Sequence, residues 1–119
     1  YMGNNQSLIK DVTIRGIGNI GINAGFIGES GPNSVQDVLI QGFDTGIKSH
    51  WCYGQTLSRI TVKDCRTVGV HIVANVVAIE ELVVENTPQA LFADYPNDWT
   101  WWSGVVALVG GKFKTTKSD

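Results

Sequence analysis

The chain has 119 residues, a formal net charge of −2 and a charged fraction of 17%. Its nine Lys and Arg residues are spread along the sequence and provide no basic patch for nucleic acid. No apolar run approaches the roughly 18 residues of a membrane span, and two cysteines are too few for a disulfide framework. We therefore expect one domain, or part of one, over residues 1–119, with no nucleic-acid partner and no membrane span.

One eight-residue pattern occurs four times, at residues 9–16, 35–42, 57–64 and 79–86. Each copy has an apolar residue, two mostly polar residues, apolar-x-apolar, a polar residue, and then Gly, Asp or Asn. After a short gap comes a small residue followed by an aliphatic one, as in Gly21-Ile22 and Gly46-Ile47. Successive copies begin 26, 22 and 22 residues apart, and periods of this size indicate a solenoid.

The alternation inside each copy predicts strands. Pairs such as Val12/Ile14 and Ile60/Val62 flank a single residue, which is the two-residue period of a strand and offers no helical stripe. Stacking the copies in register would place like residues about 4.8 Å apart. The expected inward columns are Ile9–Val35–Leu57–Ile79, Val12–Val38–Ile60–Leu82, Ile14–Ile40–Val62–Val84 and Ile22–Ile47–Val70–Leu91.

Residues suited to a sharp corner recur at one register position, which holds Gly16, Gly42, Asp64 and Asn86. These residue types enter the left-handed backbone region at low cost. They predict the same corner on every rung, where a rung is one turn of the solenoid. The fold expected is an all-β parallel β-helix. A leucine-rich-repeat horseshoe is the structural alternative, although its Leu-x-x-Leu-x-Leu and Asn/Cys signature is absent.

In chain order, the rungs are expected near residues 9–23, 35–49, 57–72, 79–92 and 108–114, which makes four to five rungs. The fifth rung matches Leu108–Phe113 with Ile9–Ile14, although Gly111 then fills an aliphatic column poorly. No amphipathic helix that could cap a solenoid precedes Leu8 or follows Phe113. We therefore expect an uncapped segment of a longer solenoid.

Two sets of residues are interpreted as structural. Asp11, Asp37, Arg59 and Glu81 share one register position, and the arginine between acids favours a surface charge ladder worth at most about 1 kcal/mol per pair. Cys65 follows the corner and is expected to be a small buried filler.

The connections that follow the small-aliphatic pair carry the variation in length, so the loops should line up along one side of the solenoid. Such a side is often the binding face. Aromatic side chains with polar edges suit a groove wall for an extended ligand. The substrate-binding candidates there are His50, Trp51, Tyr53, Tyr95, Trp99 and Trp101, and the short third connection holds Asn75. Alternatively, Trp99, Trp101 and Trp102 cover an end of the solenoid or pack on another subunit.

The same connections contain three carboxylates, Glu29, Asp94 and Asp98, which are the catalytic candidates. Two carboxyl groups held roughly 5 to 9.5 Å apart can cleave a glycosidic bond by acid–base chemistry. The alternative is that they are solvated loop acids. His71 should point outward from the third rung, and neither it nor His50 has metal-ligand spacing with a third ligand. We therefore expect no metal and no cofactor.

The rung motifs resemble the pectate-lyase-like superfamily of right-handed parallel β-helices, on Gly42–Ile47 and on Asn86–Ala90. The chain looks most like uncharacterised proteins related to polygalacturonases and rhamnogalacturonases, over about residues 8–113. The resemblance implies an extracellular or cell-surface bacterial protein. The Asn-Thr-Asp, Asp-Asp, Gly-His-Gly and Arg-Ile-Lys motifs of polygalacturonases are absent, and the arginine base and calcium-binding acids of pectate lyases cannot be placed. No catalytic residue therefore carries over from the family.

Together, these observations predict a segment of an extracellular carbohydrate-active β-helix protein that binds a polysaccharide along a loop-lined groove. As an enzyme, it would be a polysaccharide-acting glycoside hydrolase or lyase. The alternative is a non-catalytic structural or adhesive solenoid, such as a stalk, an adhesin or a tail-spike-like element. Further copies of the chain or flanking rungs of the same chain are the expected protein partners.

Overall fold

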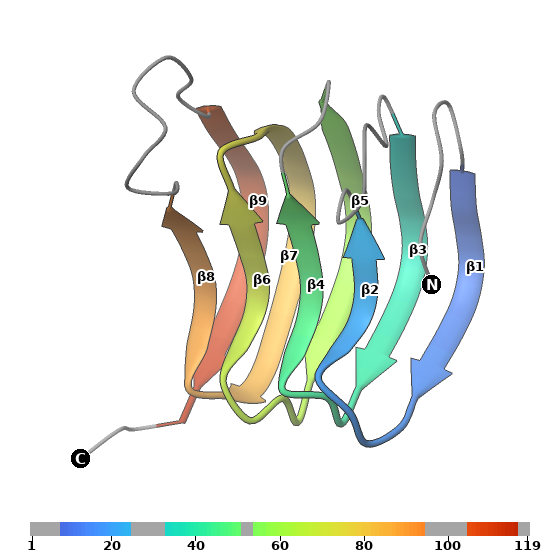
Figure 1. Ribbon diagram of the computed structural model, residues 1–119, viewed down its shortest axis with the longest axis vertical. Coiled ribbons are helices and arrows are strands. Elements are labelled where there is room, and N and C mark those ends of the chain that lie inside the picture. The colour runs from blue at the N-terminus through green and yellow to red at the C-terminus, as the bar shows by residue number, and fades with distance from the viewer. Residues whose placement is uncertain (1–7, 25–32, 51–53, 95–104, 117–119) are drawn as a thin grey trace.

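The computed structural model describes residues 8–24, 33–50, 54–94 and 105–116 of the chain. In these ranges the regular structure is entirely β-strand (Figure 1). The nine strands described are β1 (Leu8–Arg15), β2 (Ile20–Ala24), β3 (Asn33–Gln41), β4 (Thr45–His50), β5 (Gln55–Lys63), β6 (Val68–Val73), β7 (Val76–Thr87), β8 (Gln89–Asp94) and β9 (Val105–Thr115). No helix that could cross a membrane occurs in the part of the chain that the structure describes.

The strands alternate between two parallel sheets. The larger sheet has the order β1-β3-β5-β7-β9 and the smaller one the order β2-β4-β6-β8. Odd-numbered strands therefore stack on one another and even-numbered strands do the same, with the two sheets facing each other across the interior (Figure 1). The chain is a parallel β-solenoid, as predicted. The second element of each rung is a strand, whereas a leucine-rich repeat has a helix at that place. The horseshoe alternative is therefore wrong.

The four predicted inward columns are confirmed by the strand register. Val12 pairs with Val38, Val38 with Ile60, and Ile60 with Leu82, and the other three columns align in the same way. Members inside the stack are fully buried, whereas Val12 is 39% exposed because β1 has a neighbouring strand on one side only. The core is thus a stack of aliphatic layers, and the side chains of each layer are buried by the neighbouring rungs.

The fifth rung also stacks in the predicted register. On β9, Leu108 lies opposite Ile79, Gly111 opposite Leu82, and Phe113 opposite Val84. Gly111 has a φ of +132°, and a Cβ built on it would lie 2.5 Å from the Leu82 carbonyl oxygen. Backbone conformation and space both exclude a larger residue, which explains why a glycine interrupts this aliphatic column.

A second column of left-handed residues bends the long strands. Asp11, Asp37, Arg59 and Glu81 have φ values of 52° to 56°, and Gly110, opposite the same position on β9, has a φ of 70°. We call these five residues the bend column. A left-handed residue interrupts the regular alternation of a strand. The bend therefore allows positions 9 and 12, which lie three residues apart, both to face the interior, a spacing that unbroken alternation would forbid.

The predicted corner column is confirmed for three of its four members. Gly42, Asp64 and Asn86 have positive φ values of 98°, 56° and 47°. Gly16 does not, so the prediction is wrong for the first rung. The connection from β1 to β2 contains a second glycine, Gly18, which gives this turn another position of low backbone cost.

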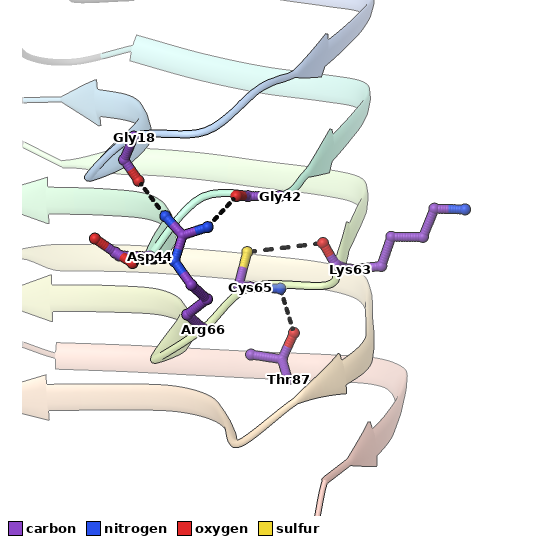
Figure 2. Close-up of polar contacts among 7 residues, drawn as sticks. All are labelled: Gly18, Gly42, Asp44, Lys63, Cys65, Arg66 and Thr87. Carbon is purple, nitrogen blue, oxygen red and sulfur yellow. Dashed lines mark hydrogen bonds and ion pairs between the residues drawn. The ribbon is translucent and has the colours of Figure 1, made fainter.

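An arginine ties three rungs together at this corner (Figure 2). The guanidinium of Arg66 donates from Nε to Asp44 Oδ1 at 2.5 Å, from Nη1 to the Gly42 carbonyl at 2.9 Å, and from Nη2 to the Gly18 carbonyl at 3.0 Å. Beside it, the Cys65 amide donates to Thr87 Oγ1 at 3.3 Å. Cys65 is a buried free thiol whose pKa is raised by that burial, which confirms the prediction of a small filler.

Candidate functional site

The strands of the smaller sheet end at one edge of the solenoid. His50, the last residue of β4, lies opposite Val73, the last residue of β6, and Val73 lies opposite Asp94, the last residue of β8. Ala24, at the end of β2, pairs with Ser49 next to His50. The four described strand ends therefore line up, as expected if the connections leave the solenoid on one side (Figure 1).

Two of the predicted site residues lie at this edge. His50 is half-buried, and Asp94 is exposed at the end of β8. They belong to the same register column two strands apart, so their Cα atoms are separated by roughly 10 Å, from a strand spacing of about 4.8 Å. The remaining candidates lie outside the described residues; these are Glu29, Trp51, Tyr53, Tyr95, Asp98, Trp99 and Trp101.

Asp94 is held by a histidine of the neighbouring strand. Val70 and Ile72 of β6 face the core, so His71 between them faces outward, as predicted. Its Nε2 lies 2.9 Å from Asp94 Oδ1, across the pairing of β6 with β8. The side chains are 22% and 42% exposed, respectively, so the pair is open to a ligand from outside. When Nε2 donates to the carboxylate, the imidazole orientation is fixed and Nδ1 is left as the second ring nitrogen for a ligand.

An exposed aromatic ring and a cation extend this pair along the sheet. Phe92 lies opposite His71 on β8, with ring centroids 5.1 Å apart and an interplanar angle of 35°. Lys48 lies opposite His71 on the other side, on β4, and no described residue forms an ion pair or a hydrogen bond with its ammonium group. We call Lys48, His71, Phe92 and Asp94 the edge site. It offers a flat apolar surface, a cation, and a hydrogen-bonded imidazole–carboxylate pair on one outer face.

The sequence predicts Asn75 in the third of the aligned connections, whereas the structure places its side chain in the core. It is fully buried, its Nδ2 donates to Ser49 Oγ at 2.8 Å, and its Oδ1 accepts from the Val76 amide at 2.8 Å. Ser49 in turn donates to Gln55 Oε1. These bonds engage both the nitrogen and the oxygen of the Asn75 amide where the chain turns from β6 into β7, whereas Gln55 Nε2 has no hydrogen-bond partner among the described residues. Asn75 therefore supports the edge from inside.

The contact between His71 and Asp94 was missed by sequence reasoning, although a signal for it exists. If Val70–Val73 is aligned with Leu91–Asp94, His71 falls opposite Phe92, and Asp94 follows two residues later on the same outward face. Inspection of the outward columns, in addition to the inward ones, would have brought the three residues together. Sequence reasoning places the candidates in the loops instead, because loops carry most binding residues.

The chemistry available at the edge site is hydrogen bonding and proton transfer. Within the described ranges, no group of three or more His, Cys, Asp and Glu side chains could hold a metal ion. The described partner of Asp94 is an imidazole rather than a second carboxyl group. A carboxylate paired with histidine can bind hydroxyl groups or exchange a proton with a ligand.

Comparison with known proteins identifies no relative of the chain. No family model matches it, and no curated protein and no solved structure is significantly similar to it. The parallel β-solenoid is consistent with a β-helix fold, while membership of the pectate-lyase-like superfamily finds no support in these comparisons.

Proposed function

We propose that the chain binds a polysaccharide across the outer face of the smaller sheet, at the edge site. The observation that carries this proposal is the exposed ring of Phe92 beside the hydrogen-bonded His71–Asp94 pair. A sugar ring has an apolar face of C–H groups and a rim of hydroxyl groups. An aromatic surface next to side chains that both donate and accept hydrogen bonds matches the two parts of such a ligand.

The arrangement of the outward column supports an extended ligand. Asn23, Lys48, His71 and Phe92 are consecutive in register on β2, β4, β6 and β8. Successive positions in such a column are about 4.8 Å apart along the solenoid axis. A chain molecule lying along this axis would meet a different side chain at each rung, so affinity could be summed over several weak contacts.

Cleavage of the bound polysaccharide is the enzymatic form of this proposal. Asp94 is then the proton-transferring group that touches the substrate, and His71 orients it through the 2.9 Å contact. Glu29 and Asp98 stay the candidates for a second carboxyl group. The reaction would be that of a glycoside hydrolase or lyase acting outside the cell, as the resemblance in the rung motifs suggests.

The test is binding of soluble polygalacturonate, arabinoxylan and laminarin by the 119-residue chain, measured by isothermal titration calorimetry. Phe92→Ala should weaken binding about tenfold, because loss of an aromatic contact costs up to about 1.5 kcal/mol in addition to the lost apolar area. Phe113→Ala is the matched control, since Phe113 is exposed to a similar extent, 47% against 41%, but lies on β9. Equal losses for the two variants, or no binding of any polysaccharide, would contradict the proposal.

Catalysis is tested separately by release of reducing ends from each polysaccharide. Asp94→Asn should abolish release and leave binding within a few-fold of the parent, because the amide keeps the size of the carboxyl group but cannot transfer its proton. Release that survives this substitution would assign the chemistry to another residue and leave the binding proposal standing.

A structural or adhesive solenoid is the second candidate, and one observation favours it. Within the described residues, β9 has a neighbouring strand only on the β7 side and exposes apolar residues along its length, including Val105, Leu108, Val109 and Phe113. Such an edge is suited to pairing with a further strand. Concentration-dependent association in sedimentation velocity, weakened by Val109→Lys and accompanied by no polysaccharide binding, would support this candidate over the first.

A further inference from the structure

A second surface feature lies on the larger sheet, away from the edge site. A groove of about 240 Å³ follows the bend column across β1, β3 and β5. One wall carries Asp11, Asp37 and Arg59 of the bend column. The other wall carries the outward residues two positions further along the same strands, Thr13, Leu39 and Thr61. We call this feature the bend groove. It follows the positions at which β1, β3 and β5 each have a left-handed residue.

The charged wall presents both acceptors and donors. Arg59 donates to Asp37 through two parallel bonds, Nε to Oδ1 at 2.6 Å and Nη2 to Oδ2 at 3.0 Å, which lowers the pKa of that carboxyl group. This geometry leaves Nη1 without a hydrogen-bond partner among the described residues. The Asp11 carboxylate, one strand away, also has no partner in the described part of the chain. A ligand in the groove would therefore meet a free donor on β5 and a free carboxylate on β1, two strands away.

The facing wall adds hydroxyl groups and an apolar platform. Thr13, Leu39 and Thr61 are consecutive in register, so the leucine lies between the two threonines. Leu39 is half-buried and keeps part of its side chain on the surface. The wall thus alternates hydroxyl, aliphatic and hydroxyl groups at the rung spacing of about 4.8 Å.

We propose that the bend groove binds a single ring of a neutral sugar. The paired and unpaired charges disfavour simple ions, since a cation would meet Arg59 and an anion would meet Asp11 and Asp37. A neutral ligand with many hydroxyl groups can donate to the carboxylates, accept from Nη1 and place a C–H face on Leu39. The volume corresponds to on the order of eight water molecules at about 30 Å³ each, which is enough space for one sugar ring.

This site lies on a different sheet from the edge site and does not rest on the function proposed for that site. The two can be separated in one experiment because their residues report independently. Amide signals of β1, β3 and β5 at residues 11–13, 37–39 and 59–61 report on the bend groove. Signals of His71, Phe92 and Asp94 report on the edge site.

The experiment is a ¹H–¹⁵N NMR titration of the labelled 119-residue chain with the methyl pyranosides of glucose, galactose and mannose. At least one sugar should shift the bend-groove amides with a common saturable dissociation constant. The double variant Asp11→Asn/Thr61→Val should weaken that binding about tenfold. Asparagine is suited to the left-handed backbone at position 11, and valine keeps the shape of threonine in a strand, so the fold is retained. Thr56→Val is the matched control on β5, because Thr56 lies outside the groove lining.

The outcomes are distinct. Saturable shifts at the bend groove that weaken in the double variant and persist in Thr56→Val support the proposal, whatever happens at the edge site. No bend-groove shift with any of the three sugars overturns it, as does equal binding by the double variant. A parallel titration with n-butylammonium chloride serves as the cation probe. If that probe alone moves the same amides, the groove is a cation site and the proposal is wrong.

Discussion

The bend column provides a direct test of how backbone conformation limits the stability of this solenoid. Glu81 and Glu85 are exposed glutamates on the same strand, β7, but only Glu81 has a positive φ, of 55°. A left-handed conformation costs a non-glycine residue roughly 1 to 2 kcal/mol. Glycine removes this cost, but it destabilises the fold by about 0.5 to 1 kcal/mol because it has greater conformational freedom in the unfolded chain. Glu81→Gly should therefore leave the free energy of unfolding unchanged or raise it by up to about 1.5 kcal/mol.

Glu85→Gly is the matched control, because the backbone there gains nothing from glycine. It should destabilise the fold by about 1 kcal/mol, because glycine has greater freedom in the unfolded chain and a lower preference for strands. The two variants should thus differ by about 1 to 2 kcal/mol, although both replace an exposed glutamate with glycine. Gly110, which occupies the bend column on β9, indicates that the position accepts glycine.

The measurement is urea unfolding of the parent and both variants, followed by circular dichroism, with the m value checked for constancy. A Glu81→Gly variant as unstable as Glu85→Gly would refute the reasoning. It would mean that the left-handed conformation at this column carries no significant cost, and that the bend is set by the neighbouring rungs without strain at Glu81.

Two further predictions concern the core and the surface ion pair. Leu82→Ala should lower the free energy of unfolding by about 3 kcal/mol because Leu82 is fully buried. Val12→Ala, in the same column but 39% exposed, should lower it by less than about 1 kcal/mol. Equal losses in urea unfolding would show that Val12 is covered in solution. The lowered pKa of Asp37 means that its ionised form stabilises the fold. That contribution is complete above the ordinary value of 3.8 and is lost as the pH falls through the lower value of the folded state. The stability difference between the parent and Asp37→Asn should therefore shrink in urea unfolding as the pH falls below about 4, and a difference independent of pH would contradict this assignment.

The repeat pattern was sufficient to predict the architecture. Every rung must present apolar residues inward at the same positions, and this requirement can be read from the local sequence. It predicts the columns through Val12 and Ile14, the parallel register, and the match of Leu108 with Ile9. The same requirement placed His71 on the outside, because Val70 and Ile72 had to be inside. The right-handed coiling of the solenoid is implied by the family resemblance alone and stays a prediction.

Other features depend on neighbours that are distant in the sequence. Arg66 donates a hydrogen bond to Gly18, 48 residues away in the sequence, and no local sequence pattern around either residue predicts this contact. Asp94 meets His71 only because consecutive rungs stack, and Asn75 is buried because Ser49 of the previous rung supplies a partner for its amide. In each case one polar group is satisfied by another rung.

The bend column shows most clearly where local sequence information ends. Asp11, Asp37, Arg59 and Glu81 share a left-handed backbone, although arginine and glutamate have no intrinsic preference for it. The conformation is imposed because Ile9 and Val12 must both enter the core from positions three residues apart. The sequence alone thus determined which residues form the interior, and only the stacking of complete rungs decided how the backbone bends to place them there. Burial of those side chains outweighs the local cost of the bend, and burial exists only in the assembled solenoid.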